Sequence, residues 1–158
     1  MAQTCTLGAT GEAFEIPPWT RVKQRFDGAH IETDAVAAAV RQSLDDSKVK
    51  LRPGWSVAIT VGSRGVANVV IITRAIVDWC VEQQAQPFVV PSMGTHGGAT
   101  ATGQQEMIEG LGCTEEALGC PIRSGMETVE LPRGDVGCPV LHDKLAAEAD
   151  AVIGALLR

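Results

Sequence analysis

The chain alternates short apolar runs with amphipathic stretches, and this pattern is strongest in its middle third. Ser56–Val61 (SVAITV) and residues 87–90 (PFVV) are runs of apolar and β-branched residues, which is typical of strands buried on both faces. Between them, apolar residues recur at helical spacing over residues 68–83. A strand, a helix and a second strand in this order predict a right-handed βαβ unit with parallel strands.

Weaker versions of the same pattern lie on either side. Residues 34–44 carry apolar positions on one helical face, and Thr33 or Asp34 is the expected N-cap. Thr114 is expected to cap a short helical turn that stops at Gly119. The remaining expected elements are helices over residues 101–111 and 144–149, and strands over residues 19–26, 122–131, 139–141 and 151–157.

Together these elements predict an α/β fold, a Rossmann-like open, mostly parallel sheet with helices on both faces. We expect a single domain over residues 19–158. Residues 1–18 lack hydrophobic periodicity, so they are expected to form a flexible N-terminal arm.

Composition narrows the range of partners. Hydrophobic residues make up 45% of the chain, and the formal net charge is −6, so there is no basic field to attract nucleic acid. No apolar run approaches the ~20 residues that a membrane-spanning helix needs. The five cysteines form no CxxC pair, and the first ten residues do not resemble a secretory signal. We therefore expect free thiols and a location in the reducing cytoplasm.

Two polar loops follow the two strongest strands. Residues 62–65 (GSRG) come directly after the first strand, and residues 94–98 (GTHGG) follow the second. The carboxyl ends of neighbouring parallel strands meet at one edge of a sheet, so both loops are expected to line one crevice.

The side chains in these loops suit acid–base chemistry beside an anion. Arg64 offers a fixed positive charge for a carboxylate or phosphate, and His96 can exchange protons near neutral pH. Neutral hydrogen bonds would come from Ser63, Ser92 and Thr95. An arginine clamp beside a histidine base suits proton or hydride transfer next to a carboxylate.

Structural roles remain open for the same residues. The alternative for His96 is a loop histidine bonded to nearby backbone, and the alternative for Arg64 is a solvated loop arginine. No GxGxxG or Walker A pattern is present, so local motifs do not indicate NAD or ATP. His142 and Asp143 lie near Cys138, but without metal-like spacing or a fourth ligand they favour a turn or strand end. We predict no metal ligands in this chain.

Long segments of the chain resemble a known family. They are GSRGVANVV, ITRAIVDW, PFVVPSMGTHGGATATGQQEMIEGLG, TEEALGCPIRSGMETVEL and CPVLHDKLAAEADAVI. These segments are similar to the N-terminal domain of the nickel-pincer lactate racemase family, above all to its uncharacterised branch. The resemblance covers about residues 20–153.

The resemblance implies a two-domain α/β enzyme with its active site in the cleft between the domains. The implied cofactor is a nickel-pincer nucleotide, covalently held by a lysine, which takes hydride from C2 of a 2-hydroxy acid and returns it to either face. By motif position, His96 resembles a catalytic histidine that acts as acid and base on the hydroxyl. Arg64, preceded by Ser63, resembles the arginine of the family's Thr-Arg motif. The resemblance thus implies that Arg64, Ser63 and Thr95 lie at the cofactor.

The chain departs from the family in two places. Val61, Gly62 and Ser63 stand where the racemases have acidic residues, which leaves the identity of the 2-hydroxy acid open. The family's second catalytic histidine, its lysine and its C-terminal domain have no counterpart before Arg158. The chain is therefore expected to bind no nickel-pincer nucleotide alone, and to need a C-terminal domain for racemase activity.

Two other functions stay open. One is a non-catalytic ligand-binding or oligomerising domain, in which an apolar partner-facing surface promotes association with a second copy. The other is a metal-free enzyme that uses His96 as a simple base.

Overall fold

The computed structural model describes residues 4–6, 13–15, 20–25, 28, 30–132 and 139–154. Contacts divide the chain into two units, Met1–His30 and Ile31–Arg158. In the first unit, strands β1 (Thr4–Thr6) and β2 (Ala13–Glu15) pair in antiparallel fashion. The strand predicted over residues 19–26 is wrong for its described part, because residues 20–25 have no regular structure. Most of the predicted arm over residues 1–18 lies outside the described residues.

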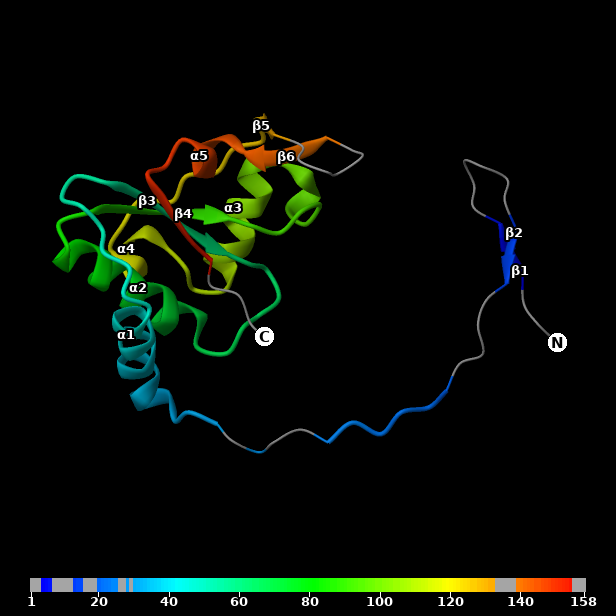
Figure 1. Ribbon diagram of the computed structural model, residues 1–158, viewed down its shortest axis with the longest axis horizontal. Helices are drawn as coiled ribbons and strands as arrows, with labels where there is room; N and C mark the ends of the chain where they lie inside the picture. Colours follow the sequence, from blue (N-terminus) through cyan, green and yellow to red (C-terminus); the bar gives the residue numbers. More distant parts are fainter. Residues whose placement is uncertain are drawn as a thin grey trace. The chain divides into compact units, whose positions relative to one another are not determined.

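The second unit is built on a three-stranded parallel sheet (Figure 1). Strand β3 (Ser56–Val61) lies in the middle, between β4 (Gln86–Pro91) and β7 (Ala151–Gly154). Strand β4 pairs with β3 along its whole length, and β7 pairs with the other side of β3. The predicted α/β fold with a mostly parallel sheet is confirmed.

Helices follow the predicted hydrophobic periodicity closely. They are η1 (Thr33–Ala35), α1 (Val36–Asp46), α2 (Val69–Glu82), η2 (Gly97–Ala99), α3 (Ala101–Gly110), α4 (Glu115–Leu118) and α5 (Lys144–Ala147). The predicted cap of α4 is confirmed, because Thr114 Oγ1 accepts from Ala117 N at 3.1 Å. The predicted cap of the first helix is wrong: Thr33 and Asp34 lie inside η1, and the N-cap of α1 is Ala35, which makes no side-chain cap bond.

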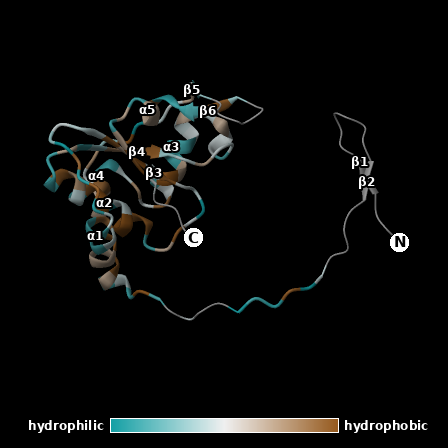
Figure 2. Cartoon of the chain, in the orientation of Figure 1, coloured by the Kyte–Doolittle hydropathy of each residue, from teal (hydrophilic) through white to brown (hydrophobic). Residues whose placement is uncertain are grey.

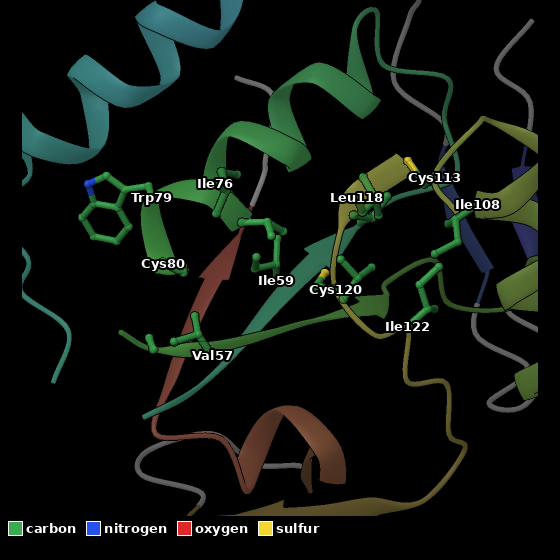
Figure 3. Close-up of a cluster of buried hydrophobic side chains, with 14 of the residues drawn as sticks. Val57, Ile59, Ile76, Trp79, Cys80, Ile108, Cys113, Leu118, Cys120 and Ile122 are labelled. Atoms are coloured by element: carbon green, nitrogen blue, oxygen red, sulfur yellow. The ribbon is translucent and has the colours of Figure 1, made fainter. Parts of the chain in front are cut away.

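Successive side chains of β3 point to opposite faces of the sheet, so the sheet buries side chains on both faces. Val57, Ile59 and Val61 point into the larger core, together with residues of α2, α3 and α4 such as Leu118. Figure 3 shows Ile59 in this core beside the short segment that carries Leu118. Ala58 points into the smaller core, where it meets Phe88, Val90 and Ala146 of α5. The predicted arrangement of helices on both faces is therefore confirmed.

The hydropathy of the elements matches this burial. In Figure 2 the hydrophobic colour gathers on α2 and on the sheet strands. Among the described residues, no helix is both long and apolar enough to cross a membrane.

A small antiparallel pair lies outside the main sheet. Strands β5 (Thr128–Leu131) and β6 (Val140–Asp143) pair with each other. The strand expected over residues 122–131 is thus shorter than predicted, although Ile122 makes an isolated parallel bridge with Val89. Residues 133–138, between the two strands, lie outside the described residues.

The stability of the folded protein is expected to depend on pH because of two thiols in its core. Burial raises the pKa of Cys80 and of Cys120 from 9.0 to about 11. Because the unfolded thiols ionise first, their contribution to stability is complete below pH 9.0 and is lost as pH rises towards about 11. We expect urea unfolding midpoints to fall across this range, and to fall less steeply in a Cys80→Ala/Cys120→Ala variant. An equally steep fall of the unfolding midpoint with pH in the two proteins would contradict this prediction.

Candidate active site

Strands β3 and β4 end side by side, as the parallel register requires. Val61 is the partner of Pro91, and Ser92 N donates to Val61 O at 2.8 Å. The loops that follow the two strands therefore start at the same level of the sheet. This confirms that Ser63 and His96 come from neighbouring strand ends.

A direct side-chain hydrogen bond joins the two loops. Ser63 Oγ lies 2.5 Å from His96 Nδ1. Ser63 is half-buried, whereas His96 is exposed. If the imidazole donates from Nδ1 to the serine oxygen, its other nitrogen, Nε2, is left as a proton acceptor facing away from the serine. This arrangement can accept a proton from a ligand.

Backbone bonds hold the loop that carries His96. His96 N donates to Met93 O at 3.4 Å, and Ala99 N donates to His96 O at 3.2 Å. Gly98 adopts φ +66, and the next residue, Ala99, has φ +54. An L residue in that region costs about 1 kcal/mol, so surrounding packing must impose the conformation.

The packing that imposes it is a backbone contact between Gly97 and Gly103. A Cβ at Gly103 would collide with the carbonyl oxygen of Gly97, and a Cβ at Gly97 would collide with the backbone of Gly103. Thr100, the N-cap of α3, bridges the two glycines, because its hydroxyl donates to Gly97 O and accepts from Gly103 N, each at 3.1 Å. Buried Gln104 completes the contact by donating from Nε2 to Gly94 O at 2.8 Å. The loop is thus fixed to the first turn of α3.

Arg64 and Thr95 lie in the same two loops. Both side chains are exposed, and each directly adjoins a member of the hydrogen-bonded pair, Arg64 next to Ser63 and Thr95 next to His96. Within the described part of the chain, Arg64 forms no ion pair with a carboxylate. Its charge is therefore available to an anionic ligand.

His142 and Asp143 have a structural position, as the sequence favoured. They end β6, and Asp143 Oδ1 accepts from Ala146 N at 2.9 Å, which caps α5. Cys138 lies outside the described residues. Among the residues that are described, no group of three or more His, Cys, Asp or Glu side chains could hold a metal ion.

The sequence did not indicate Gly103 and Gln104 as residues that support the site. Their spacing from Thr100 could have indicated this role. They follow this N-cap residue by three and four positions, so they lie on the first turn of the helix. The sequence also gave no sign of a cavity of about 400 Å³ beside Ser92, Met93 and Gly94.

Because of the contact between Gly97 and Gly103, one methyl group added at Gly103 should have a large effect on stability. Gly103→Ala should destabilise the protein by about 1–3 kcal/mol, because backbone rather than a flexible side chain must move. Gly110→Ala, in the same helix but with nothing within 4 Å of an added Cβ, should be neutral or stabilising by up to about 1 kcal/mol. Urea unfolding measures both. Similar effects for the two variants would show that the contact is not constraining.

In comparisons with known proteins, no family model, no curated protein and no solved structure matches this chain.

Proposed function

We propose that this chain forms one wall of the active site of a racemase or epimerase that acts on a 2-hydroxy acid. The observation that carries the proposal is the hydrogen bond between Ser63 and His96 at the ends of two neighbouring parallel strands. The family resemblance independently marks His96 as an acid–base residue. An exposed imidazole held by a neutral partner is suited to reach a substrate hydroxyl.

His96 moves one proton in this reaction. When hydride leaves C2, the hydroxyl becomes a carbonyl and releases its proton, which Nε2 of His96 takes up. When hydride returns to C2 from either side, His96 returns the proton to the oxygen. Ser63 keeps the ring in place through Nδ1 during both steps.

Arg64 binds the anionic group that accompanies this chemistry. Its exposed guanidinium directly follows Ser63 and carries a donor fork that matches a carboxylate or a phosphate. Thr95, next to His96, offers a neutral hydroxyl to the same ligand. We assign to these side chains the polar part of the substrate or of the cofactor.

The described residues do not fit the metal of the implied cofactor. A nickel-pincer nucleotide would supply the hydride acceptor, but no group of three metal-ligating side chains occurs among the described residues. No step of the proposal therefore passes through nickel held by this chain. We infer that a C-terminal domain provides the cofactor's anchor. We also infer a cytoplasmic location, because Cys80, Cys113 and Cys120 are free thiols.

One observation favours oligomerisation as a second candidate function. An apolar groove of about 360 Å³ lies between α1, α2 and the edge strand β7. Ile31 lines it and is 57% exposed. A second copy of the chain covering this groove would make sedimentation depend on concentration, whereas a monomer at all concentrations would remove this candidate.

The proposed role of His96 predicts a specific loss of activity. In the two-domain enzyme with its cofactor, His96→Ala should lower the rate of exchange at C2 by about 10²–10⁴-fold, because proton transfer loses its acceptor. His30→Ala, which changes an exposed histidine of the first unit, is the matched control. Racemisation by chiral chromatography measures both. An unchanged rate for His96→Ala would refute the role, and turnover without metal or cofactor would support the metal-free alternative.

A further inference from the structure

A cavity of about 400 Å³ lies on the α5 face of the sheet, next to the carboxyl ends of the strands. Thr60 of β3 and Val90 and Pro91 of β4 line it from the sheet. Residues of β5, β6 and α5 line it from the other side, including Leu141 and Ala146. Its volume is within the range of small-molecule sites, and this end of a parallel sheet is where α/β proteins bind ligands.

The cavity is continuous with the loop that carries His96. Ser92, Met93 and Gly94 line the cavity, and they directly precede Thr95 and His96. Gly94 has no side chain, and a Cβ built there would meet nothing within 4 Å. A ligand that lies along this loop therefore meets no side chain at Gly94.

The lining is apolar with an acidic edge. The apolar part consists of Val90, Pro91, Met93, Met126, Leu141 and Ala146. Glu127 and Asp143 contribute carboxylates, His142 contributes an imidazole, and neither Lys nor Arg is among the lining residues. Lys144, which is not a lining residue, forms an ion pair with Glu127 at 2.8 Å. A second carboxylate on a ligand would thus be repelled here, while an uncharged apolar group would be accepted.

We propose that this cavity binds the substituent at C2 of the substrate, and that the substituent is an uncharged aliphatic group larger than methyl. This inference rests on the proposed role of His96. It selects branched aliphatic 2-hydroxy acids over lactate, whose methyl group leaves the cavity mostly unfilled, and over 2-hydroxy dicarboxylates. Each methylene buried should tighten binding about fourfold.

Nuclear magnetic resonance titrations of the 158-residue chain test the pocket and the site separately. The probes are lactate, 2-hydroxy-4-methylpentanoate and 2-hydroxybutanedioate, and the reporters are the ring signals of His96 and the methyl signals of Met93 and Met126. We expect each of the three acids, where it binds, to shift the ring signals of His96. Only 2-hydroxy-4-methylpentanoate should also shift the two methionines, and it should bind about tenfold or more tightly than lactate.

A pair of matched variants localises the effect. Met126 lines the cavity and is 50% exposed, whereas Met107 on α3 is 37% exposed and does not line it. Met126→Asp should remove the preference for 2-hydroxy-4-methylpentanoate while His96 still responds to lactate. Met107→Asp should keep the preference.

The outcomes separate the two proposals. Equal binding of lactate and 2-hydroxy-4-methylpentanoate with shifts at His96 but not at the methionines would overturn the pocket and leave the proposed function standing. Shifts at the methionines without any response of His96 would overturn the proposed function, and the inference with it. Tighter binding of 2-hydroxybutanedioate than of 2-hydroxy-4-methylpentanoate would overturn the predicted selectivity.

Discussion

The candidate site depends on the close approach of two backbones, at Gly97 and Gly103. No side chain fits between them, so the loop after β4 lies directly on the first turn of α3. Thr100 satisfies a polar group of each glycine, and the left-handed conformation of Ala99 is sustained by this packing rather than by its own preference. His96 is thereby presented to Ser63 by a rigid support instead of a free loop. A precise acid–base site needs such a support.

The elements that the sequence predicted well are those whose burial is decided locally. Strand β3 matched its prediction residue for residue, because a short run of β-branched and apolar residues favours a strand buried on both faces. The strand expected over residues 19–26 failed because alternation alone is insufficient: a strand also needs a partner to pair with. The cap at Thr33 failed for a related reason, since a 3₁₀ turn extends the helix past the best capping residue.

The candidate site was predictable in position but not in its contacts. The rule that parallel strands end at one edge placed the loops of Ser63 and His96 together, and the register of Val61 with Pro91 explains why the rule holds here. The bond between Ser63 and His96 joins residues 33 positions apart, so no local pattern encodes it. The cavity beside Gly94 is also a tertiary property, because it depends on how β5, β6 and α5 pack over the sheet.

A serine partner has a chemical consequence for His96. A racemase must take a proton and return it within one turnover, so neither protonation state of the base should be strongly preferred. A carboxylate bonded to Nδ1 would stabilise the imidazolium and oppose the return of the proton. The Ser63 hydroxyl is neutral and can accept from Nδ1 before and after proton uptake at Nε2. It therefore orients the ring without placing a negative charge next to it, which is consistent with the proposed role in a reversible reaction.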